Sequence, residues 1–239
     1  ESSALEYIEA ISKNNKIFKT YIGEGFHPTF IPPVILRNLL ENPGWYTSYT
    51  PYQSEISQGR LESLFNFQTL IAELTGLPYA NASLLDEATA ASEAMYIANS
   101  FHNGKRRKFF LLKDVFKFIK EVVYTRANYL DIEIIEGDLD SLKKLNFEDF
   151  SGILIQNPNS NGAVIDYSHV TLKAKASNCL SISINDPLSF LIIKSPADMG
   201  FDISVGNTQR FGVPMMNGGP HAGFLAVKED LNRKMPGRV

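Results

Sequence analysis

The sequence predicts an α/β fold with a mostly parallel sheet, preceded by a helical arm. Two observations carry this prediction. From residue 109 onward, short apolar runs alternate with helical patterns, which is typical of parallel strands covered by helices on both faces. Before residue 60, helical segments are joined by proline- and glycine-rich stretches with no strand pattern. We therefore divide the chain into an N-terminal helical arm with an aromatic loop (1–60) and an α/β domain (61–239).

The arm is predicted to contain two helices. Residues 3–12 form the first. The second begins at Pro32-Pro33 and runs through residues 34–42, because proline is tolerated in the first helical turn. Pro43-Gly44 then ends it.

Two longer helices follow in the first half of the chain. Ser57 is the expected N-cap of one, whose apolar residues recur at helical spacing until Gly76. The other spans residues 85–101 and is rich in alanine. Its opening acids, Asp86 and Glu87, favour the positive end of a helix.

The rest of the chain is predicted to alternate between strands and helices. Helices are expected over residues 115–125, as a single turn at 141–145, and after Ser168. The expected strands are the short apolar runs at residues 109–112, 132–135, 152–156, 180–184, 190–194, 203–206 and 223–227.

Composition indicates an ordinary globular chain. The 239 residues are 44% hydrophobic and 21% charged, with a formal net charge of −3, so neither nucleic acid nor membrane is an expected partner. The basic run at residues 105–108 is interpreted as a solvated turn before a strand. Cys179 is the only cysteine, which excludes an internal disulfide and predicts a packed thiol in a reducing compartment.

Four aromatic residues lie within eight positions: Trp45, Tyr46, Tyr49 and Tyr52. Large rings with polar tips on a turn-rich segment suit a loop that contacts substrate. They suit equally a loop that closes the end of a core. The chemistry of these residues alone leaves both interpretations open.

Longer segments resemble one known family. Residues 21–62, 81–95, 206–227 and 233–238 are similar, in the same order, to the N-terminal half of the glycine decarboxylases, the pyridoxal-phosphate P-proteins of the glycine cleavage system. Residues 109–181 resemble that family only in pattern. Four ordered matches are far more specific than a single short motif.

The resemblance implies a fold and a division of labour. The fold is the large domain of aspartate-aminotransferase-type (fold type I) pyridoxal-phosphate enzymes, with a seven-stranded sheet. The family has two homologous halves, and the half that is absent here carries the lysine-bound cofactor. The chain opens with Glu1 and stops at Val239, so we expect a fragment of a longer polypeptide, with any transit peptide outside it. The implied location is bacterial cytoplasm or the mitochondrion.

The implied reaction is the decarboxylation of glycine, followed by transfer of the aminomethyl group to the lipoyl group of the H-protein. The half described by this sequence would support and complete the active site of the other half. The implied partners are the C-terminal half or a sister subunit that carries the cofactor lysine, and the lipoylated H-protein. We also expect a dimer.

Two positions mark the degenerate cofactor site that the resemblance implies. Asp186 follows a strand and resembles the aspartate that holds the pyridine nitrogen of the cofactor, although Asp186-Pro187 also suits a simple turn. Arg210 stands where the family's catalytic half has its lysine. A guanidinium stays charged at working pH and cannot act as the amine nucleophile. No covalently held cofactor is therefore expected on this chain.

Two loops could also face the crevice of a parallel sheet. Residues 157–162 follow a strand and form either a surface turn or one wall of a cofactor site. Residues 83–89 enter a helix N-terminus, which is a natural anion site. Asp86 and Glu87 lie where a phosphate would approach, so their repulsion argues against phosphate binding.

The candidate substrate-binding residues come mostly from the aromatic loop. No catalytic residue and no metal site are expected, since the four histidines are scattered without ligand spacing. The residues that we predict to shape the glycine pocket are Tyr49, Tyr52, Gln53, Tyr46, Gln58 and His27.

Two other functions remain open. One is a non-catalytic module that docks the lipoyl carrier or a sister subunit. The other is a different pyridoxal-phosphate enzyme, such as an aminotransferase or desulfurase, that uses another lysine. Spectroscopy of the purified chain separates the second from the first.

Overall fold

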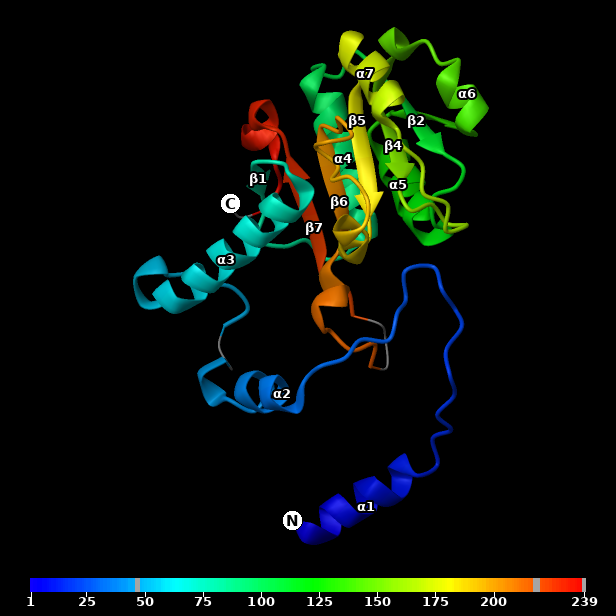
Figure 1. Ribbon diagram of the computed structural model, residues 1–239. Coiled ribbons are helices and arrows are strands. Elements are labelled where there is room, and N and C mark those ends of the chain that lie inside the picture. The colour runs from blue at the N-terminus through cyan, green and yellow to red at the C-terminus, as the bar shows by residue number, and fades with distance from the viewer. Residues whose placement is uncertain (46–47, 217–219, 238–239) are drawn as a thin grey trace.

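The computed structural model describes residues 1–45, 48–216 and 220–237. The chain forms a seven-stranded sheet with the order β1-β7-β6-β5-β4-β2-β3, most of whose strands are labelled in Figure 1. Strands β2 to β6 pair in parallel, whereas β7 pairs antiparallel with both β6 and β1. The strands span Tyr79–Ala80 (β1), Lys108–Leu112 (β2), Glu133–Gly137 (β3), Phe150–Gln156 (β4), Leu180–Asn185 (β5), Ile203–Asn207 (β6) and Gly223–Val227 (β7).

The predicted mostly parallel sheet of seven strands is confirmed. The predicted helices are present as well, with shifted ends. The α-helices span Ser2–Ser12 (α1), Pro33–Leu40 (α2), Gln58–Thr75 (α3), Glu87–Phe101 (α4), Lys117–Tyr129 (α5), Leu139–Lys143 (α6) and Ser168–Ala176 (α7). Two short 3-10 helices, Pro187–Leu191 (η4) and Thr208–Phe211 (η5), follow strands β5 and β6.

One strand prediction is wrong and one strand was missed. Residues 190–194 lie largely in and after η4, and the side chains of Leu191 and Ile192 are 71% and 86% exposed, so this apolar run does not enter the sheet. The missed strand is β1, which has only two residues. Its length is too short for any periodic pattern to identify it.

The main core lies between α4 and the sheet. Helix α4 contacts α5 and strands β4 to β7. Its small side chains, Ala88, Ala91, Ala94 and Ala98, are buried, which lets the helix approach the strands closely. Cys179 belongs to this core, and burial raises the pKa of its thiol to about 12, so the predicted packing role is confirmed.

A smaller cluster joins α3 to the antiparallel edge of the sheet. It contains Ile71 and Leu77 together with Ala80 of β1 and Phe224 of β7, all buried. Gly76 ends α3 in the left-handed conformation, with φ of 71°, as the sequence predicts. Ser57 occupies the N-cap position, but its side chain makes no capping hydrogen bond.

The N-terminal arm lies largely outside this packed body. Helix α1 has no buried residue and extends away from the sheet (Figure 1). One part of the arm does touch the domain: residues 23–30, which we call the strap. The Thr29 hydroxyl donates to the carbonyl of Val213 at 2.9 Å, and the Phe26 ring lies 5.9 Å from that of Phe118. The boundary near residue 60 stays a prediction.

Among the described residues, no helix is both long enough and apolar enough to cross a membrane.

Candidate functional site

A cavity of about 270 Å³ lies at the carboxyl ends of the parallel strands β4, β5 and β6. This edge of an open parallel sheet is where ligands usually bind. The strap and the start of α4 complete its walls. The lining residues are Glu24, Gly25, His27, Glu87, Phe116, Gln156, Pro158, Asn159, Ser160, Gly162, Ile184, Asn185, Asp186, Asn207, Gln209 and Arg210.

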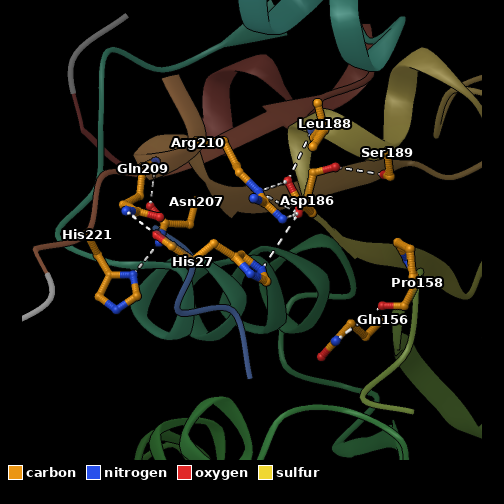
Figure 2. Close-up of polar contacts among 10 residues, drawn as sticks. All are labelled: His27, Gln156, Pro158, Asp186, Leu188, Ser189, Asn207, Gln209, Arg210 and His221. Atoms are coloured by element: carbon orange, nitrogen blue, oxygen red, sulfur yellow. Dashed lines mark hydrogen bonds and ion pairs between the residues drawn. The ribbon is translucent and has the colours of Figure 1, made fainter. Parts of the chain in front are cut away.

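An ion pair between Arg210 and Asp186 occupies one wall of the cavity, as Figure 2 shows. The guanidinium Nε donates to Asp186 Oδ2 at 2.9 Å and to Oδ1 at 3.2 Å, and Nη2 donates to Oδ2 at 2.7 Å. Both side chains are only 25–29% exposed. Charge-assisted contacts of this two-nitrogen kind are among the strongest hydrogen bonds in proteins.

Short 3-10 helices fix both partners of this pair. Asp186 begins η4, and its Oδ1 also accepts from the backbone N–H of Leu188 at 3.0 Å. Arg210 lies on η5, which Asn207 caps: Oδ1 of Asn207 accepts from the backbone N–H groups of Gln209 and Ala222, each at 3.0 Å. The pair is therefore anchored to the ends of two adjacent strands.

The loop over residues 157–162 forms the opposite wall. Gln156 Oε1 accepts from the backbone N–H of Phe116 at 2.9 Å, and its amide donates to the carbonyl of Pro158 at 3.2 Å. Asn159 Oδ1 accepts from the N–H groups of Asn161 and Ala163. The loop thus satisfies its own polar groups, and it lines the cavity rather than acting only as a surface connection.

Glu87 brings a carboxyl group into the cavity from the first turn of α4. The residue is only 5% exposed, and its Oε1 has no hydrogen-bond partner among the described residues. Burial, together with the nearby carboxylates of Asp86 and Asp186, raises its pKa to about 8. Glu87 is therefore mainly protonated at neutral pH.

The protonation of Glu87 corrects one step of the sequence argument. The sequence predicted that two charged acids, Asp86 and Glu87, would repel a phosphate. In the structure only Asp86 acts as an acid that caps the helix. Its Oδ1 accepts from the N–H of Thr89 at 2.6 Å, as an N-cap does. Glu87, with its raised pKa, contributes little negative charge at this position at neutral pH.

The strap closes the cavity from the side of the arm. A Cβ at Gly25 would lie 3.3 Å from Glu87 Oε1 and 3.4 Å from the Phe116 ring, and φ at Gly25 is +87°. Glycine therefore permits both the backbone conformation and the close approach. The amide of Gln209 donates to the carbonyl of His27 at 3.1 Å, which ties the strap to η5.

Two histidines stand near the ion pair in neutral form. Burial, and then the charge of Arg210, lower the pKa of His27, while Asp186 raises it less. His27 Nε2 lies 3.9 Å from Asp186 Oδ2, too far for a hydrogen bond. Burial also lowers the pKa of His221, whose Nδ1 contacts the Asn207 amide. Neither ring supplies a cation at neutral pH.

Of the predicted substrate-binding and degenerate cofactor-site residues, His27, Asp186 and Arg210 line the cavity, together with Glu87 and part of the loop 157–162. The predicted residues of the aromatic loop lie elsewhere. Tyr49 and Tyr52 are 94% and 73% exposed. Gln53 and Gln58 are exposed as well, and none of the four lines the cavity. Tyr46 lies outside the described residues.

None of the residues that line the cavity is a lysine. Among the lysines outside the cavity lining, Lys194 is 59% exposed and pairs with Asp166 at 2.7 Å. The sequence suggests no partner for Lys228, but Lys228 pairs at 2.8 Å with the buried Asp202 and is only 30% exposed. No group of three His, Cys, Asp or Glu residues that could hold a metal ion occurs in the described ranges.

Sequence reasoning missed the hydrophobic part of the cavity and underestimated Glu87. Phe116 and Ile184 give the cavity apolar walls, and neither stands in a motif. For Glu87 a pattern was available. It lies four and seven positions before Ala91 and Ala94, both buried, so helical periodicity puts it on the face of α4 that meets the sheet.

Comparison with known proteins gives a consistent result over the full chain. A family model described as the glycine cleavage system P-protein matches residues 1–239. The mitochondrial glycine dehydrogenase (decarboxylating) of Solanum tuberosum is 47% identical over 241 residues, which cover 100% of this chain and 23% of that protein. The chain thus spans about a quarter of the length of the curated relatives it matches.

Solved structures agree with the predicted fold type. A crystal structure of glycine decarboxylase (P-protein), in inhibitor-bound form, matches with a TM-score of 0.89 and 34% identity, over 99% of this chain and 55% of that one. A protein described as an O-acetylhomoserine (thiol)-lyase from Campylobacter jejuni, whose structure carries a pyridoxyl-lysine monophosphate, matches with a TM-score of 0.55 and 18% identity, over 70% of this chain and 40% of that one. The second likeness concerns the fold alone.

Proposed function

Because the chain belongs to the glycine cleavage system P-protein family, we propose that it forms the N-terminal, cofactor-free part of a glycine dehydrogenase (decarboxylating). In this proposal the full enzyme decarboxylates glycine and passes the aminomethyl group to the lipoyl group of the H-protein. Pyridoxal phosphate supplies the electron sink for that chemistry from another part of the enzyme. The residues described here buttress that part and complete its pocket.

The observation that carries the proposal is the Arg210–Asp186 ion pair. A pyridoxal-phosphate site needs a lysine amine, an acid that is available for the pyridine nitrogen, and an unobstructed anion site. Here the cavity lining has no lysine, the carboxylate of Asp186 is bound by Arg210, and Glu87 fills the start of α4. The residues present therefore do not fit the cofactor, and no catalytic step is assigned to this cavity.

The exposed apolar surface of the arm supports a buttressing role. Of the 31 large hydrophobic side chains that are exposed among the described residues, 17 lie in residues 1–60, a quarter of the chain. Examples are Ile17 at 97%, Phe30 at 95% and Tyr21 at 89%. Apolar surface on this scale marks a region that another protein surface covers. The C-terminal half or a sister subunit of the enzyme, with a dimer as the resulting assembly, is the partner that we propose.

The exposed position of the aromatic loop agrees with this picture. Tyr49 and Tyr52 face solvent instead of closing a core, and they are too exposed to be packing residues. We propose that they reach the glycine pocket of the partner half, together with Gln53 and the weaker candidates Gln58 and His27. Tyr46 is proposed on sequence grounds alone.

The alternatives differ in how the structure bears on them. A module that only docks the lipoyl carrier or a sister subunit is favoured by the same apolar arm, and it overlaps with our proposal. An independent pyridoxal-phosphate enzyme, such as an aminotransferase, receives no support from a cavity without a lysine. The plant relatives are mitochondrial, which supports the mitochondrion as the location if the source is eukaryotic. For a bacterial source, the proposed location stays the cytoplasm.

The absence of a covalent cofactor on these residues is testable by borohydride reduction of the full-length protein, which fixes pyridoxyl groups on lysine. Digestion and mass spectrometry are expected to find the pyridoxyl group only on a lysine outside residues 1–239. Lys194 and Lys228 serve as internal checks, because their peptides should be recovered unmodified. A pyridoxyl group on any lysine of this chain would contradict the proposal.

Replacement of Tyr49 or Tyr52 by phenylalanine in the full-length enzyme is expected to lower kcat/KM for glycine by about five- to tenfold. Loss of one hydrogen bond at a binding site is worth roughly 1 kcal/mol, which corresponds to such a factor. The measurement is the exchange of labelled carbon dioxide with glycine. Tyr129→Phe is the matched control, since Tyr129 is also exposed (85%) but lies at the end of α5. Unchanged kinetics in both test variants would reject the contact.

A further inference from the structure

The cavity retains polar groups that its own contacts do not use. Glu87 Oε1 has no partner, although the residue is 95% buried. Arg210 donates to Asp186 through Nε and Nη2 only, so its Nη1 makes no hydrogen bond among the described residues. An unpaired oxygen as deeply buried as Glu87 Oε1 is rare in native proteins, whereas the Arg210 side chain is 25% exposed. Both atoms belong to side chains that line the same space of about 270 Å³.

The charges around this space indicate what it can accept. The charged and titratable groups around this space come from every wall: Glu24 and His27 from the strap, Asp186 after β5, Arg210 on η5, and Asp86 beside Glu87 at the start of α4. Arg210 and Asp186 compensate each other, and His27 is neutral. With Glu87 protonated, the remaining excess charge is negative and comes from Glu24, which is exposed, and from Asp86, which caps α4. A phosphorylated anion would find no uncompensated cation there.

We propose that this cavity is a reversible binding site for a small zwitterionic α-amino acid. The ligand's carboxylate accepts from the free Nη1 of Arg210, and its ammonium group donates to the unpartnered Oε1 of Glu87. Phe116 and Ile184 give the cavity an apolar wall for the ligand's side chain. A zwitterion matches a site that offers a guanidinium N–H to a carboxylate and an acid that can ionise beside an ammonium group.

The geometry has a measurable consequence for protons. A positive ammonium beside Glu87 favours the ionised carboxylate, so binding near neutral pH releases the Glu87 proton to solvent. The ligand keeps its own charges, and no covalent bond is formed or broken. An amino acid that binds at a site without Glu87 would release no such proton.

The test is isothermal titration calorimetry with glycine as the probe, on full-length protein that has first been reduced with borohydride. Reduction fixes the cofactor elsewhere in the enzyme and prevents a new covalent bond to glycine. Titrations in two pH 7 buffers with different ionisation enthalpies give the number of protons released. Glycine is expected to bind with proton release, while acetate and methylamine, which each carry one of its charges, bind at least tenfold more weakly.

Variants assign the binding to this cavity. Glu87→Gln is expected to abolish proton release and to weaken glycine binding at least fivefold, and Arg210→Met to weaken it at least tenfold. Glu93→Gln is the control, because Glu93 lies on the same helix but pairs with Arg126 outside the cavity. Circular dichroism checks that each variant is folded. Absence of glycine binding, or binding and proton release that neither cavity variant changes, would overturn the proposal and leave the proposed function untouched.

Discussion

The Glu87→Gln variant is expected to be more stable than the natural protein at pH 7, by about 2 kcal/mol. Most substitutions of a buried polar group destabilise a protein, so an increase in the free energy of unfolding would be a distinctive result. Glu87 is 5% exposed and its Oε1 is unpaired, and burial with two neighbouring carboxylates raises its pKa from the ordinary 4.5 to about 8. Glutamine has a similar shape and no proton to lose.

The sign of the effect follows from proton binding. Between pH 4.5 and 8 the folded protein holds the Glu87 proton, while the unfolded chain has released it. Ionisation therefore stabilises the unfolded state as pH rises. As a result, the free energy of unfolding falls between pH 4.5 and 8. Below pH 4.5 both states are protonated and the penalty vanishes. Glutamine removes this dependence, although its amide keeps part of the burial cost.

The measurement is hydrogen exchange of the peptides that cover α4, in urea at pH 5, 7 and 9, so that this region is observed separately from the rest of the full-length protein. The natural protein should lose protection from pH 5 to pH 9, and Glu87→Gln should lose much less. Glu93→Gln, on the same helix and 23% exposed, should follow the natural protein. Parallel pH profiles for Glu87→Gln and the natural protein would show that Glu87 is already ionised when folded.

Glu87 also illustrates what the sequence could and could not predict about the site. Its helix was predicted, and the acid was placed correctly in the first turn. Its burial depends on which face of α4 meets the sheet. The spacing of the buried alanines indicates that face, but a charged residue is not ordinarily expected on it. Its raised pKa depends on this burial and, in part, on Asp186, which lies 99 positions further along the chain. A local sequence pattern cannot predict that contact.

For the ion pair between Asp186 and Arg210, too, the sequence predicted the residues but not their contact. Each residue was singled out separately, Asp186 from its place after a predicted strand and Arg210 from its place where the resembling family has its lysine. Their contact follows from the register of two parallel strands, because Asn185 pairs with Gly206 and both chains leave the sheet at the same edge. The sequence predicted the strands but not their neighbours in the sheet. The pairing of oppositely charged groups therefore became visible only in three dimensions.

For the fold, prediction succeeded where apolar runs were both long and buried. Strands β4 and β5 are fully buried and were identified almost to the residue. The run at 190–194 has the same composition but follows Asp186 and Pro187, which begin a 3-10 helix and direct Leu191 and Ile192 to solvent. Apolar composition alone does not distinguish a buried strand from a surface that a partner covers.

The Gly206→Ala variant is expected to prevent stable folding, with a loss of more than about 4 kcal/mol. Gly206 lies in β6, inside the sheet. A Cβ there would lie 2.1 Å from the carbonyl oxygen of Asn185 and 2.6 Å from Cε1 of Phe224. The first is backbone of the paired strand, and the second belongs to a ring with no exposed surface. Neither neighbour can move without separating strands.

The comparison that tests this account is Gly59→Ala. Gly59 lies in the first turn of α3, and a Cβ there would meet nothing within 4 Å. Alanine should stabilise this helix by up to about 1 kcal/mol. The readouts are the soluble yield and thermal unfolding of the full-length protein. A second change, Phe224→Leu, should not rescue Gly206→Ala, because the clash with the Asn185 carbonyl remains. Rescue by that change, or normal folding of Gly206→Ala, would show that β5 and β6 can separate without disrupting the site at their ends.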